Sequence, residues 1–152
     1  MRVLLDTNVL ISYLLTPRRD SPILTILQGA FSGKFVLLMP AQLLEELAKV
    51  LSKKRYLAER INQEEMGEFV DLLLDVAESI PLISEAIPAV TRDVKDDYLL
   101  ASALVGQADY LVTGDKDLLS LSQFENLKLL SPADFLRVLE NSQHAPRGHS
   151  ES

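Results

Sequence analysis

Short apolar runs alternate along this chain with longer stretches of helical period. A short, mainly apolar run of three to five residues is typical of a strand buried on both faces of a parallel sheet. Such runs occur at residues 3–5, 35–39, 109–113 and 127–130. Residues 79–83 are expected to form a strand at a sheet edge, because Pro81 cannot donate a hydrogen bond to a neighbouring strand.

Apolar residues at helical spacing predict helices between these strands. Two of the helices carry a clear start signal, a serine followed by a proline at the first helical position, at Ser21-Pro22 and Ser131-Pro132. The expected helices cover residues 9–15, 22 to about 31, 41–55, 63–77, a segment that ends at Gly106, and 132–139. Alternating strands and helices predict an α/β protein, a three-layer α/β/α fold with a central, mostly parallel sheet.

Length and composition favour one domain. The chain has 152 residues, of which 47% are hydrophobic, enough for one core. We expect a domain over residues 1–140 and a disordered polar tail over residues 141–152. No apolar run approaches the roughly 18 residues that span a bilayer, and no signal peptide is evident, so the sequence predicts a cytoplasmic protein without a membrane segment.

Residue usage narrows the chemistry that the chain can perform. The absence of cysteine excludes disulfides and thiolate metal sites, and both histidines, His144 and His149, lie near the C-terminus. A metal site would therefore use oxygen ligands. The net charge of -7 argues against general electrostatic coating of nucleic acid. It is compatible with a cluster of carboxylates that binds cations.

Two aspartates follow predicted buried strands. Asp6 comes directly after residues 3–5, and Asp115 follows residues 109–113 after a glycine that allows a sharp turn. Ligands bind at the carboxyl ends of strands in open α/β sheets, so both carboxylates are candidates for a site there. The alternative for Asp6 is that it only caps the helix that follows.

Two further acids lie on predicted helices. Asp96 shares a face with Leu99, Leu100, Ala103 and Leu104, which makes an unpaired carboxylate costly there. The helix dipole alone explains acids such as Asp93 and Asp97 in a first helical turn. Glu45 and Glu46 flank the apolar stripe of residues 41–55. Val50 extends that stripe towards Glu46, so Glu46 is the better site candidate of the two. The alternative is that both glutamates are solvated.

These acids are expected to converge at the carboxyl edge of the sheet. At an effective dielectric constant of about 20, two carboxylates roughly 5 Å apart repel by about 3 kcal/mol. Several such pairs require proton uptake or a cation. A divalent metal ion is the simplest explanation.

Four short motifs resemble the PIN-domain family of metal-dependent ribonucleases, which includes the VapC toxins of toxin-antitoxin pairs. The resemblance covers about residues 2–139. Its motifs are Leu5-Asp6-Thr7-Asn8, Glu46-Leu47, Asp96 leading into residues 99–103, and the run from Val112 to Leu118. Each motif is short, and their order and spacing together give the resemblance its specificity.

The resemblance implies a role for individual residues of this chain. The acidic metal site would consist of Asp6, Glu46, Asp96 and Asp115, with Asp117 as a fifth member or an outer group. Thr7, Asn8 and Thr113 would position carboxylates, water or phosphate. Many toxins of the family have a small residue after the third acid where this chain has Asp97, so Asp93 and Asp97 are outer candidates.

The activity that the resemblance implies is hydrolysis of RNA phosphodiesters with one or two Mg²⁺ or Mn²⁺ ions. The implied partners are RNA, a cognate antitoxin and a second copy of the chain in a homodimer. Charge and proximity along the sequence indicate possible RNA contacts at Arg18, Arg19, Lys49, Lys53 and Lys116.

Other protein classes fit less well. A phosphatase of the haloacid-dehalogenase type has the pattern Asp-x-Asp, whereas position 8 here is asparagine. A receiver domain would have its phosphoacceptor on a middle strand, and residues 35–40 offer none. The main alternative is a catalytically silent PIN-like module that binds RNA or a protein without cleavage.

Overall fold

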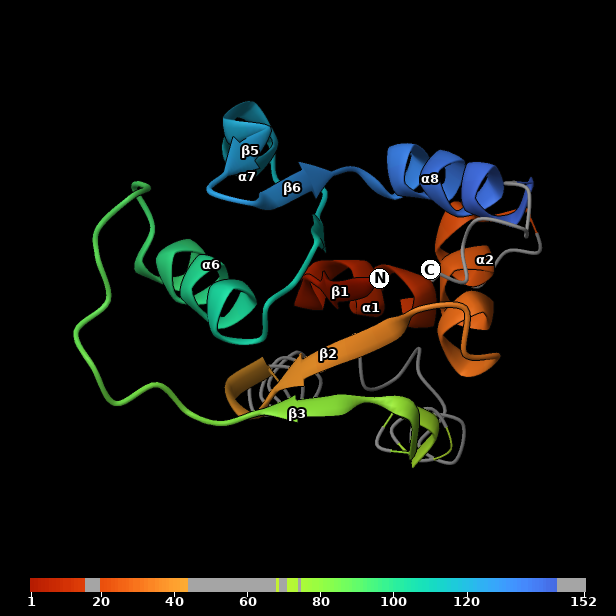
Figure 1. The fold of residues 1–152 in the computed structure, drawn as a ribbon, viewed down its shortest axis with the longest axis horizontal. Coiled ribbons are helices and arrows are strands. Elements are labelled where there is room, and N and C mark those ends of the chain that lie inside the picture. The colour runs from red at the N-terminus through yellow and green to blue at the C-terminus, as the bar shows by residue number, and fades with distance from the viewer. Residues whose placement is uncertain (16–19, 44–67, 69–70, 74, 145–152) are drawn as a thin grey trace, which may run out of the picture.

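The computed structural model describes residues 1–15, 20–43, 68, 71–73 and 75–144. Its centre is a six-stranded sheet in the order β3-β2-β1-β4-β6-β5 (Figure 1). Five strands are parallel, and β5 alone runs antiparallel, against β6. The strands are β1 (Arg2–Leu5), β2 (Val36–Pro40), β3 (Glu78–Ile80), β4 (Tyr110–Val112), β5 (Gln123–Phe124) and β6 (Leu127–Leu130).

The helices begin where the sequence carries capping groups. The Ser21 hydroxyl accepts a hydrogen bond from the Ile23 amide at 3.2 Å, and the Ser131 hydroxyl accepts one from the Asp134 amide at 3.2 Å. No helix in the described part of the chain is long and apolar enough to cross a bilayer. The helices are α1 (Thr7–Leu15), α2 (Pro22–Phe31), α6 (Val94–Val105), α7 (Lys116–Leu121) and α8 (Pro132–His144).

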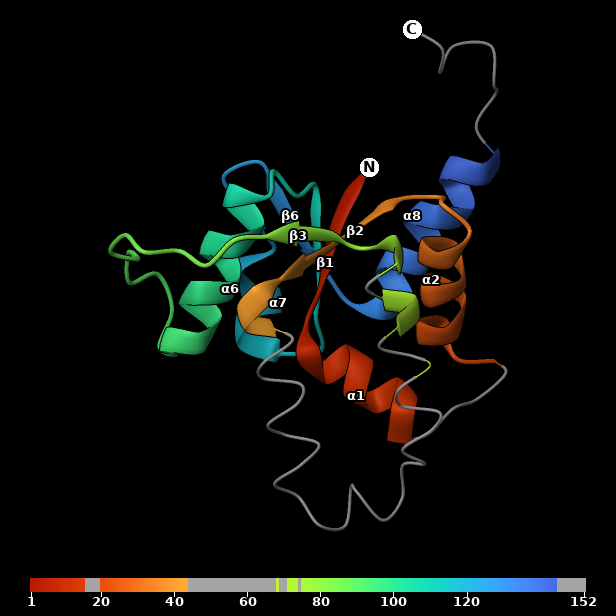
Figure 2. The same ribbon diagram turned by 90° about the horizontal axis from the view of Figure 1, so that it is seen from below.

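Alternate residues of the central strand enter two separate cores. Val3 and Leu5 pack with residues of α1, α2 and α8, whereas Leu4 packs with residues of α6 and α7. All three strand residues are fully buried. Helices therefore cover both faces of the sheet, as Figure 2 shows, and the predicted three-layer α/β/α architecture is confirmed.

Several predicted elements match the structure and others differ in detail. The strand at residues 127–130 has the expected bounds, and β3 lies at the sheet edge and ends before Pro81. The two-residue strand β5 was not predicted. Helix α8 continues to His144, beyond the expected end at Leu139 and into the segment predicted as tail, because the polar residues 140–144 include no proline or glycine to end it.

Parts of the prediction fall on segments for which only a little can be stated. Residues 41–43 are helical, as are residues 68, 71–73 and 75–76, in agreement with the two helices expected there. The remainder of both helices and residues 145–152 lie outside the described residues. One prediction for α6 is wrong: Leu104 is 36% exposed. It does not belong to the buried face of the helix, which is formed by Leu99, Leu100 and Ala103.

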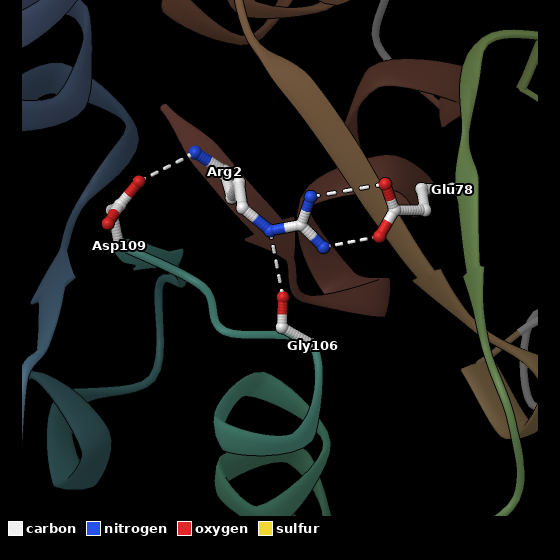
Figure 3. Close-up of polar contacts among 4 residues, drawn as sticks. All are labelled: Arg2, Glu78, Gly106 and Asp109. Carbon is white, nitrogen blue, oxygen red and sulfur yellow. Dashed lines mark hydrogen bonds and ion pairs between the residues drawn. The ribbon is translucent and has the colours of Figure 1, made fainter.

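Arg2 holds together the amino edge of the sheet, that is, the side where the parallel strands begin (Figure 3). Its guanidinium forms a two-pronged ion pair with the Glu78 carboxylate, and its Nε donates to the Gly106 carbonyl at 2.9 Å. The Arg2 backbone N–H donates to the Asp109 carboxylate at 2.8 Å. Hydrogen bonding from Arg2 lowers the pKa of Glu78. Arg2 thus joins β1, β3 and the end of α6, and compensates the acids beside it.

Candidate active site

A pocket of about 290 Å³ opens at the carboxyl edge of the sheet, where the parallel strands end. Three of the four predicted metal ligands, Asp6, Asp96 and Asp115, line it together. They come from the end of β1, the first turn of α6 and the start of α7. The other lining residues are Thr7, Asn8, Pro40, Gln42, Leu43, Asp93, Lys95, Tyr98, Leu99 and Ser102.

Asp6 is both a helix cap and a wall of the pocket. Its backbone N–H donates to the Val112 carbonyl at 2.9 Å, which continues the pairing of β1 with β4. Its Oδ1 accepts from the Asn8 amide at 3.3 Å, at the start of α1. The two roles considered for Asp6 are therefore compatible, since one carboxylate oxygen caps the helix and the other is directed elsewhere.

The buried hydroxyl of Thr113 connects two of the acids. Leu5 pairs with Val112, so Thr113 lies beside Asp6 as the two strands end. Its Oγ1 donates to Asp6 Oδ2 at 2.8 Å and accepts from the Asp115 amide at 3.0 Å. Thr113 is 0% exposed. One side chain therefore fixes the Asp6 carboxylate and the loop that carries Asp115.

Asp115 caps α7 in the same way that Asp6 caps α1. Its Oδ1 accepts from the Asp117 amide at 2.8 Å. The predicted likeness of the two aspartates holds for the cap but differs in register: the residue beside Asp6 is Thr113, and Asp115 follows two residues later.

The three acids at the start of α6 have three different environments. Asp93 is the N-cap and accepts from the Lys95 amide at 2.9 Å. Asp96 lines the pocket, as the sequence predicted. The most buried of the three is nevertheless Asp97, which is 7% exposed and lies outside the pocket lining.

Asp97 holds the loop that leads into α6. Its Oδ1 accepts from the amides of Val90 and Thr91 at 3.0 and 2.7 Å, and from the Thr91 hydroxyl at 2.9 Å. These bonds, above all that from the Thr91 amide, lower the pKa of Asp97. The geometry supports a structural role for this carboxylate.

Two of the pocket acids have a raised pKa. Burial and, after it, the negative charges of Asp115, Asp93, Asp6 and Asp117 together raise the pKa of Asp96 to about 6. Burial also raises the pKa of Asp6, against the hydrogen bond from Thr113, which lowers it. Negative charge is therefore under-compensated here, which favours binding of a proton or a cation.

The donor set fits a divalent cation in its chemistry. Carboxylate oxygens are the ligands that Mg²⁺ and Mn²⁺ prefer, and three such groups face one pocket. Among the described residues, however, no three acidic or histidine side chains stand close enough together to form a ready-made metal site. Closer approach of the acids, or further ligands, would be needed to complete the coordination.

Several predicted site residues do not enter this picture. Asp117 and Lys116 are exposed at the start of α7 and do not line the pocket, although the charge of Asp117 acts on Asp96. Six candidates lie outside the described residues: Glu45, Glu46, Arg18, Arg19, Lys49 and Lys53.

The sequence prediction did not include the pocket residues Lys95, Tyr98, Leu99 and Ser102 of α6 among its site candidates. Lys95 and Ser102 line the pocket together with Leu99. The spacing of these three residues, i, i+4 and i+7, places them on one helix face. That spacing was the available signal, but the apolar residues of the neighbouring face dominate the pattern.

Comparison with known proteins agrees with this architecture. The family model of the PIN domain matches residues 2–117. None of the curated proteins matches the chain. Among solved structures, the chain is similar to one chain of VapBC2 from Rickettsia felis bound to a DNA fragment from their promoter, with a TM-score of 0.56 and 18% identity over 85% of this chain and 97% of that chain. At this identity the likeness is one of fold.

Proposed function

Because this chain belongs to the PIN-domain family, we propose that it is a metal-dependent endoribonuclease that hydrolyses RNA at the carboxyl edge of its sheet. One observation carries the proposal: Asp6, Asp96 and Asp115 share a pocket in which the pKa of both Asp6 and Asp96 is raised. Capping accounts for Asp6 and Asp115 singly but does not require three carboxylates to share one pocket, and the set suits a cation.

Asp6, Asp96 and Asp115 would hold Mg²⁺ or Mn²⁺, with Glu46 as a further ligand. A bound divalent cation lowers the pKa of an attacking water and neutralises negative charge on the phosphate. Thr113 positions this machinery, because its hydroxyl fixes one oxygen of Asp6 and the backbone of Asp115. The two helix caps keep both aspartates at the edge of the sheet.

A toxin role is the finer part of the proposal. The fold similarity to a chain of VapBC2 supports an assignment as the toxin of a toxin-antitoxin pair, with an antitoxin protein as partner. A homodimeric assembly and a cytoplasmic location belong to the same proposal. A neighbouring open reading frame whose product binds this chain and suppresses its activity would support that role. If no such product exists, the activity belongs to RNA processing.

The experiment for the ribonuclease itself is an incubation of the purified chain with a pool of single-stranded and structured RNAs. We expect cleavage with Mg²⁺ or Mn²⁺ and none with excess chelator. If calorimetry shows that Mn²⁺ binds, yet the metal-loaded protein leaves every RNA intact over hours, the catalytically silent binding module is the better description.

A further inference from the structure

The pocket extends along α6 beyond the carboxylates. Lys95, Leu99 and Ser102 lie on one face of the helix and all line the pocket. At a rise of 1.5 Å per residue, Lys95 and Ser102 are separated by roughly 10 Å along the helix axis. The pocket lining thus spans about two turns of α6 beside the acids.

Ser102 is a buried polar group without a partner. It is 1% exposed, and its hydroxyl forms no hydrogen bond, the only such case among buried side-chain atoms in the described ranges. Burial of a hydroxyl without a partner is unfavourable, so such groups are rare without a reason. A group on the pocket wall can obtain its partner from a ligand.

Lys95 supplies a positive charge on the same face of α6, at the opposite end from Ser102. It is exposed and lines the pocket together with Asp93 and Asp96. No ion pair joins its ammonium group to a carboxylate within the described segments. An ammonium group that has not been neutralised is well suited to a phosphate.

We propose that Lys95 and Ser102 form a nucleotide subsite, in which the ammonium group contacts a phosphate and the hydroxyl bonds to the nucleoside attached to it. The inference rests on the proposed function for its choice of RNA as ligand. The volume of about 290 Å³ is close to the lower limit of roughly 300 Å³ for ligand pockets and suits a single nucleotide.

The test is titration of the full chain, with Mg²⁺ present, by three probes: a nucleoside 5′-monophosphate, ribose 5-phosphate and inorganic phosphate. Loss of one hydrogen bond weakens binding by about fivefold to tenfold. Ser102→Ala should weaken the nucleoside monophosphate by that factor and leave inorganic phosphate unchanged. Lys95→Gln should weaken all three probes. The response of ribose 5-phosphate to Ser102→Ala distinguishes a contact with the sugar from one with the base.

Matched controls are Lys34→Gln and Ser120→Ala, which alter exposed residues away from the pocket. Ser102→Ala should also unfold at the same or a higher temperature than the parent, because it removes an unpaired buried hydroxyl. Ser102→Cys, of similar size, provides a second variant. Unchanged affinity for every probe in either the Ser102 or the Lys95 variants overturns the subsite. Nucleotide binding requires no cleavage, so its outcome is separate from that of the ribonuclease assay.

Discussion

The two edges of the sheet treat charge in opposite ways. At the amino edge, Arg2 pairs with Glu78 and Asp109, and the pKa of Glu78 is lowered. At the carboxyl edge, acids gather without a comparable basic partner among the described residues, and the pKa of Asp96 is raised to about 6. The first arrangement stabilises the fold, and the second stores repulsion that a cation would relieve. This contrast separates a structural polar network from the set of acids on which the proposed function rests.

The largest expected effect is on cleavage by Asp6→Asn. Asparagine caps a helix as well as aspartate does, so α1 should persist while a ligand charge is lost. We expect a fall in RNA cleavage beyond the roughly 10–100-fold that is typical for outer partners of a metal ligand. Glu78→Gln, which removes an acid at the amino edge, is the matched control in the same assay. Equal losses in both variants would contradict a functional distinction between the edges.

Thr113→Val should have the next largest effect. Valine keeps the shape but leaves Asp6 Oδ2 without a donor and the Asp115 amide without an acceptor. We expect unfolding to become easier by about 1–3 kcal/mol and cleavage to fall about 10–100-fold. Chemical denaturation and the RNA assay measure the two effects. Thr113→Ser keeps the hydroxyl and should recover most of both, and its failure to do so would point to packing instead.

The stored repulsion predicts a specific pH dependence for protein without metal ions. The folded state raises the pKa of Asp96 from 3.8 to about 6, so it favours the protonated carboxyl. The contribution of the protonated Asp96 carboxyl to the stability of the folded state is fully present below pH 3.8 and is lost as the pH rises through about 6.

Asp96→Asn should therefore gain stability over the parent as the pH rises from 4 to 7, and reach about 1 kcal/mol once solvent screening is allowed for. Urea unfolding in the presence of a chelator measures the difference. A difference that is constant with pH, or a variant that is less stable at pH 7, would show that the acids are not strained.

The smallest effect is expected at the amino edge, with the opposite sign. Since the pKa of Glu78 is lowered, its contribution is present at neutral pH and is lost as the pH falls through that lowered value. Glu78→Gln should be slightly less stable than the parent at pH 7, and the deficit should shrink in acid. Arg2→Met should behave similarly and leave RNA cleavage unchanged. A deficit that grows in acid would refute the assigned pairing.

The sequence predicted those features that depend on local pattern. The apolar runs gave the central strands, and the residues after them gave Asp6 and Asp115, because parallel strands bring their carboxyl ends to one edge. The position of Asp96 one turn before Leu99 and Leu100 predicted that it faces inward, and it lines the pocket.

Features that depend on long-range contacts could not be predicted in this way. The burial of Asp97 requires the course of the loop at Val90 and Thr91. The role of Thr113 requires the register between β1 and β4. The pairing of Arg2 with Glu78 reaches across β2, between residues distant in sequence.

A crystal soaked in Mn²⁺ and measured at a wavelength that gives anomalous signal from manganese tests the central claim most directly. The predicted result is an anomalous peak at the carboxyl edge, within about 2.0–2.6 Å of carboxylate oxygens of Asp6, Asp96 or Asp115. The same soak of an Asp6→Asn crystal should weaken or abolish the peak. A crystal of the parent that shows no manganese in this pocket at saturating concentration, or shows it only elsewhere on the molecule, would contradict the account.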